Sequence, residues 1–300
     1  MRLAIPVVAF LLIVPLAACN KPQDANAEDH AMHTEESPAG DDATPAAAAD
    51  STLPASGDEA KARLASSPRH GEWAMVGTGA GDSTRVWVVY PERSDKAPVV
   101  VVIHEIFGLS PWIRSVADQL AAEGFIAIAP DLLTKYNIPG SPLEPDADSA
   151  RAAIAELTPA ETNRQLDAVA KWGMALPAAL PTYGVVGFCW GGSASFNHAT
   201  HAPDLGAAVV YYGTSPRSEA LANVRAPVLG LYGGNDARVN ATIPAADSTM
   251  RALGKSYRPE IFEGAGHGFL RQQAGANGAN MAATRAAWPA TVNFLRDNLK

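Results

Sequence analysis

One cysteine stands where a catalytic nucleophile would be placed, in the segment GFCWGG at residues 187–192. The segment follows a stretch with a strand pattern and precedes one with a helix pattern, which is the context of a nucleophile elbow. Small residues around Cys189 would let the backbones approach closely in a tight turn. The thiol would then lie at a helix N-terminus, where the helix dipole favours the thiolate. The alternative is a small buried cysteine in a glycine-rich turn.

A cysteine nucleophile needs a base and a group that orients the base. Asp236 follows the apolar run 227–232, and His267 lies in a glycine-rich loop after the run 259–262. The order nucleophile, acid, histidine along the chain is that of α/β-hydrolases. Because each residue comes after a predicted strand, we expect the three side chains to lie at one edge of a parallel sheet.

Other histidines give only weak signals for a metal site. His198 and His201 have the i, i+3 spacing of one helix face, but no third ligand accompanies them. His30, Met32 and His33 lie close together in a segment without predicted geometry. A metal site needs ligands held at fixed positions, so we expect neither a metal ion nor an organic cofactor.

The chain after Glu72 alternates between strand patterns and helix patterns. The strand-like runs are 85–90, 98–104, 125–129, 183–187, 207–212, 227–232 and 259–262; the helix-like runs are 111–123, 149–157, 160–176, 191–201, 243–253 and 281–299. The run 98–104 is apolar throughout, as expected of a strand buried on both faces. This alternation predicts an α/β fold with a mostly parallel central sheet flanked by helices on both faces.

The first 18 residues have the pattern of a secretory signal, with one basic residue, an apolar run and then small residues. The sequence LAAC at residues 16–19 resembles the lipobox of bacterial lipoproteins, which implies cleavage before Cys19 and lipidation of that cysteine. We therefore expect a periplasm-facing lipoprotein of the cell envelope, held to the bilayer by its acyl chains. Asn20 mildly favours the outer membrane over the inner membrane. Plain signal cleavage and an uncleaved anchor are the alternatives.

Residues 19–68 are predicted to be a disordered, acidic tether rich in Ala and Pro. The part from residue 20 carries ten acidic and three basic side chains, which accounts for −7 of the formal net charge of −8. It has few large aliphatic residues, so burial cannot offset the entropy of ordering. The remaining domain, residues 69–300, is nearly neutral and lacks a basic stripe, which argues against nucleic acid as a partner.

The domain resembles the dienelactone hydrolase family, the carboxymethylenebutenolidase-like branch of the α/β-hydrolases, over roughly residues 72–300. The resemblance rests on HEIFG at 104–108, APDL at 129–132, the elbow at 187–192, the loop of Asp236 and GHGF at 266–269. It implies an α/β-hydrolase fold and a triad of Cys189, Asp236 and His267.

The resemblance also implies roles for residues around the triad. Glu105 matches a glutamate that assists deprotonation of the cysteine, although a purely structural carboxylate is the alternative. The backbone N–H groups of Trp190 and Ile106 would form the oxyanion hole. Arg271 matches one of two arginines that hold the substrate carboxylate. Residues 131–160 depart from the family pattern, and Arg151 is our prediction for the second arginine.

These features predict a monomeric enzyme, a carboxylic ester hydrolase that acts on a small-molecule ester or lactone through an acyl-enzyme intermediate. The same fold and triad would also suit a general carboxylesterase or thioesterase of the cell envelope, because a fold does not determine a substrate. A non-catalytic binding protein with the α/β-hydrolase fold is the alternative from another class. A redox thiol protein is disfavoured, because Cys189 has no resolving cysteine at CxxC spacing.

Overall fold

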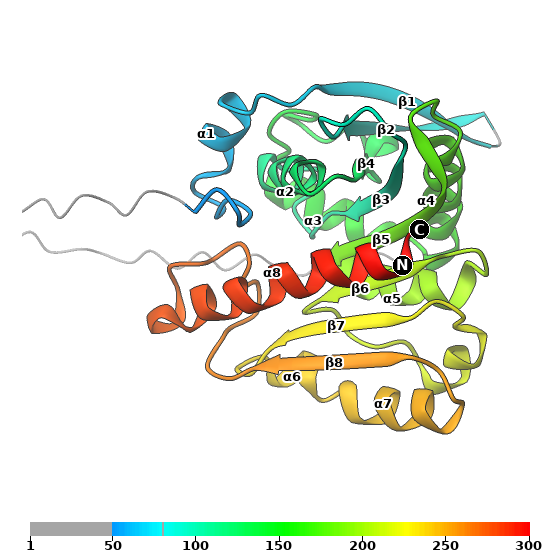
Figure 1. Cartoon of the computed structure of the whole chain (residues 1–300), viewed down its shortest axis with the longest axis vertical. Helices are drawn as coiled ribbons and strands as arrows, with labels where there is room; N and C mark the ends of the chain where they lie inside the picture. The colour runs from blue at the N-terminus through cyan, green and yellow to red at the C-terminus, as the bar shows by residue number, and fades with distance from the viewer. Residues whose placement is uncertain (1–49, 80) are drawn as a thin grey trace, which may run out of the picture. The chain divides into compact units, whose positions relative to one another are not determined.

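The structure is a computed structural model that describes residues 50–79 and 81–300 (Figure 1). The predicted signal sequence, the predicted lipidation site Cys19 and residues 20–49 of the predicted tether lie outside the described residues. No helix in the described ranges combines the length and the apolar character needed to cross a bilayer.

An eight-stranded sheet forms the centre of the domain, in the order β1-β2-β4-β3-β5-β6-β7-β8. β2 pairs antiparallel with both β1 and β4, and every other neighbouring pair is parallel. This arrangement confirms the predicted, mostly parallel sheet, with β1 and β8 at its two edges (Figure 1). The strands are β1 Gly71–Gly79, β2 Asp82–Val89, β3 Ala97–Ile103, β4 Ile126–Asp131, β5 Ala179–Phe188, β6 Ala207–Tyr211, β7 Val228–Gly233 and β8 Tyr257–Phe262.

Helices cover both faces of the sheet. One hydrophobic core contains residues of α1 Ala60–Ala65, α2 Pro111–Ala122 and α8 Ala279–Asn298. The other core contains residues of α3 Ala147–Glu156, α4 Pro159–Met174, α5 Trp190–His201 and α7 Ile243–Ala252. The short helices are α6 Ala237–Asn240 and the 3₁₀ turns η1 Thr134–Tyr136, η2 Ser218–Asn223 and η3 Ala276–Gly278.

β3 shows why a continuous apolar run was needed at this position. Val99 and Val101 belong to one core, and Val100 and Val102 belong to the other, because successive side chains of a strand point to opposite faces. All four are fully buried. Each buried valine stabilises the fold by about 1.5–3 kcal/mol, so β3 anchors both layers of helices.

The structure differs from the sequence-based expectation at the edge strand β1. No strand was predicted over Gly71–Gly79, which pairs with β2 from Gly71↔Val89 onward. Only Val76 and Thr78 are buried in this strand, so its sequence lacks the apolar run that marked the inner strands. Pairing with β2, a tertiary contact, orders it.

The prediction of a disordered tether is wrong for residues 50–68. Leu53 and Ala60 are buried in the core that α2 and α8 share. The indole Nε1 of Trp112 donates a hydrogen bond to the carbonyl of Ala55 at 3.1 Å. Composition averaged over the whole segment hid the few apolar residues at its end that dock on α2.

Leu53 supplies a direct test of this docking. We expect Leu53→Ala to lower the free energy of unfolding by about 2–4 kcal/mol, because the side chain is only 5% exposed. Leu253→Ala is the matched control, since Leu253 is 45% exposed and should change stability little. Urea denaturation of both variants measures the difference. Equal, small effects would mean that residues 50–59 do not pack on the domain.

Candidate active site

Five side chains with functional chemistry follow five neighbouring strands. Glu105 comes after β3, Cys189 after β5, Tyr212 after β6, Asp236 after β7 and His267 after β8. These strands are adjacent and parallel, so their carboxyl ends lie at one edge of the sheet. Open α/β sheets bind ligands at this edge, which identifies it as the candidate site.

Cys189 occupies the strained turn between β5 and α5. Its φ of 57° and ψ of −115° lie in a region that side-chain-bearing residues rarely adopt. The turn is held by its N–H, which donates to the carbonyl of Tyr211 at 3.0 Å. A Cβ on Gly187 would lie 1.9 Å from the carbonyl oxygen of Gly191, so only glycine fits there. The predicted elbow geometry is therefore present, with the thiol half-buried.

The thiol does not have the lowered pKa that its place at a helix N-terminus led us to expect. Burial raises the pKa of Cys189, and the nearby carboxylates of Glu105 and Asp236 raise it further. The N–H of Trp190 and the charge of Arg238 act in the opposite direction but do not prevail. The resting cysteine is therefore a thiol that needs a proton acceptor before it can attack.

His267 and Asp236 form the hydrogen-bonded pair that a base and its orienting acid require. Nδ1 of His267 lies 2.5 Å from Oδ2 of Asp236, whose side chain is buried. The other carboxylate oxygen of Asp236 accepts from the N–H of Val239 at 3.4 Å. The two loops are joined by the N–H of Asn235, which donates to the carbonyl of Ala265 at 2.9 Å. Nε2 of His267 is thus left to act on a reacting group, because Nδ1 is engaged.

Glu105 is buried at the end of β3 with little compensation for its charge. The side chain is 4% exposed, and burial raises its pKa to about 7, while Arg271 acts to lower it. Nη1 of Arg271 lies 3.7 Å from Oε2, an ion-pair distance too long for a hydrogen bond. Oε2 has no hydrogen-bond partner among the described residues. Glu105 can therefore exchange a proton near neutral pH.

Two arginines meet at the ring of Phe107. The guanidinium carbon of Arg271 lies 4.6 Å from the ring centroid, and that of Arg151 lies 4.9 Å from it. Arg151 is on α3 and pairs with Asp148 at 2.7 Å. Sequence alone could not place Arg151 at this site, because residues 131–160 do not follow the family pattern. The structure brings both predicted arginines to one aromatic side chain.

His104 holds the peptide group that carries the N–H of Ile106. Its Nδ1 donates to the carbonyl of Glu105 at 2.7 Å, and that carbonyl and the N–H of Ile106 belong to the same peptide unit. The His104 ring also stacks on Trp190, with centroids 5.8 Å apart. Burial lowers the pKa of His104, so the ring stays neutral. One buried side chain thus contacts both segments that carry the predicted oxyanion donors.

Sequence reasoning missed Tyr212, which it treated only as the end of a strand. The residue has a positive φ of 40° and is fully buried, and its ring centroid lies 5.1 Å from that of His267. Burial and the charge of Glu105 raise its pKa well above the usual value. Its hydroxyl has no hydrogen-bond partner within the described part of the chain. The only sequence signal was a polar aromatic residue directly after a buried strand.

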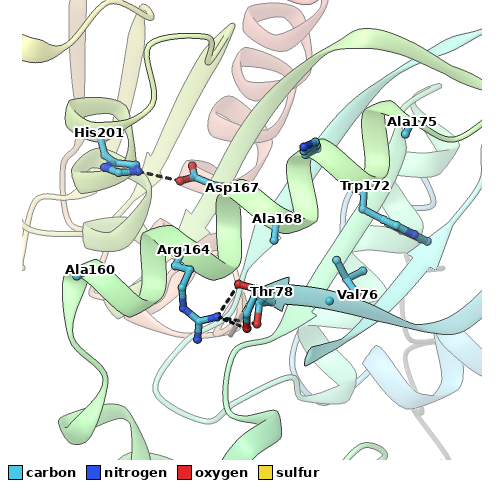
Figure 2. Close-up of a pocket in the computed structure, with 12 residues that line it drawn as sticks. Val76, Thr78, Ala160, Arg164, Asp167, Ala168, Trp172, Ala175 and His201 are labelled. Carbon is cyan, nitrogen blue, oxygen red and sulfur yellow. Dashed lines mark hydrogen bonds and ion pairs between the residues drawn. The ribbon is translucent and has the colours of Figure 1, made fainter. Parts of the chain in front are cut away.

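A cavity of about 690 Å³ lies elsewhere, between β1 and α4 (Figure 2). Three of its polar side chains are already engaged: Nη1 of Arg164 donates to the carbonyl of Thr78 at 2.6 Å, and His201 pairs with Asp167 at 2.8 Å. None of the predicted catalytic residues lines it. Its size therefore does not make it the reaction site.

The remaining histidine of the predicted helix face is structural. Nε2 of His198 bonds the hydroxyl of Tyr183 at 3.1 Å, and Nδ1 bonds Oδ1 of Asn163 at 3.1 Å. Across residues 50–79 and 81–300, no three His, Cys, Asp or Glu side chains are grouped as a metal site would require.

Comparisons with known proteins show what the chain is similar to. The family model described as "Dienelactone hydrolase family" matches residues 84–299. A Salmonella typhimurium protein named "Putative carboxymethylenebutenolidase" is 32% identical over 201 residues, spanning 63% of this chain and 74% of that protein. A Mus musculus protein named "Carboxymethylenebutenolidase homolog" is 31% identical over 195 residues, spanning 61% of this chain and 76% of that protein. The resemblance inferred from the motifs is confirmed.

A solved structure supports the same fold. The crystal structure described as "Putative Dienelactone Hydrolase" from Klebsiella pneumoniae is 26% identical and superposes with a TM-score of 0.68. The match covers 76% of this chain and 98% of that one. Residues before position 84 lie outside the family match.

The buried Glu105 makes the stability of the fold depend on pH. Between pH 4.5 and about 7 the unfolded chain releases the Glu105 proton before the folded chain does, so stability falls as pH rises. Glu105→Gln lacks this titration. We compare the unfolding free energy of E105Q with that of wild type at each pH. The difference between the two proteins should shift in favour of E105Q by up to about 3 kcal/mol from pH 4.5 to pH 8. Urea denaturation of both proteins at both pH values measures this shift. The same difference between E105Q and wild type at pH 4.5 and pH 8 would contradict the raised pKa of Glu105.

Proposed function

The chain belongs to the dienelactone hydrolase family, and on that premise we propose that it cleaves a carboxylate-bearing ester or lactone with Cys189 as nucleophile. Family membership makes the chain a hydrolase of the lactone or ester type. The observation that carries the finer proposal is the 2.5 Å contact between His267 and Asp236, at the sheet edge where Cys189 forms its elbow. A nucleophile, a base and an orienting acid are the parts that acyl transfer requires.

The substrate's carboxylate binds the arginines beside Phe107. The guanidinium carbons of Arg271 and Arg151 each lie within 5 Å of the ring centroid of Phe107, so two positive charges are available to an anionic group at this ring. A guanidinium offers two parallel N–H donors to a carboxylate, which orients the substrate as well as holding it. The reacting carbonyl is then directed toward Cys189.

Substrate binding also activates the nucleophile. Arg271 lowers the pKa of Glu105 in the resting site. A substrate carboxylate that draws Arg271 to itself weakens this effect, and the pKa of Glu105 rises. Glu105 then takes the proton of the Cys189 thiol, which leaves a thiolate only when substrate is bound.

Acylation follows from attack of the thiolate on the carbonyl carbon. The N–H groups of Ile106 and Trp190 stabilise the oxyanion, and each such donor contributes about 3–4 kcal/mol. The carbon–oxygen bond of the ester breaks, and the leaving oxygen departs as an enolate or other stabilised anion. The acyl group is then a thioester on Cys189.

Deacylation uses water and His267. Nε2 of His267 takes a proton from water while the oxygen attacks the thioester, and Asp236 stabilises the resulting imidazolium. The carbon–sulfur bond breaks, and the Cys189 thiolate recovers its proton from Glu105. His267 then releases its proton to solvent, which restores the resting site.

Loss of either reacting group tests the proposal. We expect Cys189→Ala and His267→Ala to lower kcat/KM by at least about 10³-fold on anionic lactones and esters. His201→Ala is the matched control, because His201 pairs with Asp167 in the separate cavity and should retain wild-type activity. Spectrophotometric hydrolysis assays of the full chain give these values.

The same assay separates the alternatives. Full hydrolysis by C189A would rule out Cys189 as nucleophile, and no hydrolysis by the wild type would favour a non-catalytic binding protein. A wild type that prefers neutral esters or thioesters would be a general carboxylesterase or thioesterase instead.

We also propose that the enzyme is held at the cell envelope through lipidated Cys19, with the outer membrane favoured. The support is the lipobox-like sequence at residues 16–19. We expect Cys19→Ser to move the protein from the membrane fraction to the soluble fraction in a bacterial host, as followed by immunoblotting. Equal fractionation of the two forms would contradict lipidation at this residue.

A further inference from the structure

A segment outside the family match lies against the residue that would bind the substrate carboxylate. This segment, Leu53–Glu59, is called the N-terminal strap below. It precedes the family match, which begins at residue 84, yet Leu53 and Ala55 are buried in the domain. The strap faces the loop that contains Arg271, and both line one cavity of about 650 Å³.

Backbone hydrogen bonds join the strap to that loop. The N–H of Gly57 donates to the carbonyl of Arg271 at 2.8 Å, and Nε2 of Gln273 donates to the carbonyl of Pro54 at 2.9 Å. Because Gln273 is buried, its bond to the strap is shielded from water. The strap therefore fixes the backbone on which the Arg271 side chain is mounted.

Gly57 also leaves room for the Arg271 side chain in its observed direction. A Cβ on Gly57 would lie 3.1 Å from Cγ and 3.2 Å from Nε of Arg271, which is closer than carbon atoms normally pack. These atoms are in the middle of the side chain, so a larger residue at position 57 would displace them by at least a few tenths of an ångström and shift the guanidinium with them. The bare backbone of Gly57 allows Arg271 to reach both Glu105 and Phe107.

The strap has internal hydrogen bonds that engage the carboxylate of Glu59. The N–H and hydroxyl of Ser56 donate to a carboxylate oxygen of Glu59 at 3.2 and 2.9 Å, and the N–H of Glu59 donates back to the Ser56 hydroxyl at 3.4 Å. This reciprocal pattern is a capping box before α1. The carboxylate of Glu59 is thus engaged with Ser56 while Arg271 pairs with Glu105.

We propose that the N-terminal strap is a specificity-determining element, which holds Arg271 in the orientation that recognises the carboxylate of an anionic substrate. The inference rests on the proposed function, because it needs Arg271 to bind the substrate anion. It adds that this recognition depends on residues before the family domain.

Gly57→Leu tests the strap without changing any reacting group. The assay compares mono-4-nitrophenyl adipate with 4-nitrophenyl hexanoate, which share chain length and leaving group and differ in one carboxylate. We expect G57L to raise KM for the adipate by about 10-fold or more, the usual effect of losing a hydrogen bond to a charged group. The kcat for the adipate and the kinetics with the hexanoate should stay within about threefold of wild type, a fraction of a kcal/mol.

Two variants calibrate the result. Gly77→Leu is the matched control, because a Cβ at Gly77 meets no atom within 4 Å, and both esters should react as in wild type. Arg271→Gln sets the selectivity expected when the guanidinium is absent. If G57L does not fold, Gly57→Ala provides a smaller displacement, and a smaller rise in KM, again for the adipate alone, is expected.

The outcomes separate this inference from its premise. If wild type prefers the adipate but the Gly57 variant keeps this preference, or loses activity equally on both esters, the strap does not determine specificity. In that case carboxylate recognition by Arg271 still stands. A wild type without preference for the adipate overturns carboxylate recognition and the strap's role with it. Hydrolysis of neither ester would overturn the proposed function itself.

Discussion

The ion pair between Arg271 and Glu105, 3.7 Å apart, connects the parts of this site. Burial raises the pKa of Glu105 to about 7, and Arg271 limits that rise. Glu105 in turn raises the pKa of the Cys189 thiol. A change in the position of Arg271 therefore alters the proton affinity of a carboxyl, and through it the state of the nucleophile. One positive charge can thus couple substrate recognition to activation.

The sheet makes this coupling possible because it supplies rigid positions for groups far apart in the chain. β3, β5, β6, β7 and β8 each end beside a functional residue. Their side chains alternate between two cores, so the strands are fixed from both faces. The strained backbone of Cys189 is maintained by this packing, since a flexible turn would relax to an unstrained conformation.

Charge and burial compete at Cys189, Glu105 and His104, and burial determines the direction of each pKa shift. The N-terminus of α5 favours the Cys189 thiolate, but desolvation and two carboxylates outweigh it. His104 is held neutral by its complete burial. In the resting site Cys189 is a thiol, and the Glu105 carboxylate is held by Arg271 against a burial that favours its neutral form. An anion that draws Arg271 away therefore favours transfer of the thiol proton to Glu105.

The sequence by itself determined the α/β class, the inner strands and the order Cys189, Asp236 and His267, because apolar periodicity and glycine-rich turns are local signals. It did not determine which distant segments meet. Arg151 reached the ring of Phe107, and residues 50–59 docked beside Arg271, through packing between elements far apart in the chain. The raised pKa of Cys189 was likewise decided by the tertiary structure, because desolvation depends on what surrounds a group and not on its neighbours in sequence.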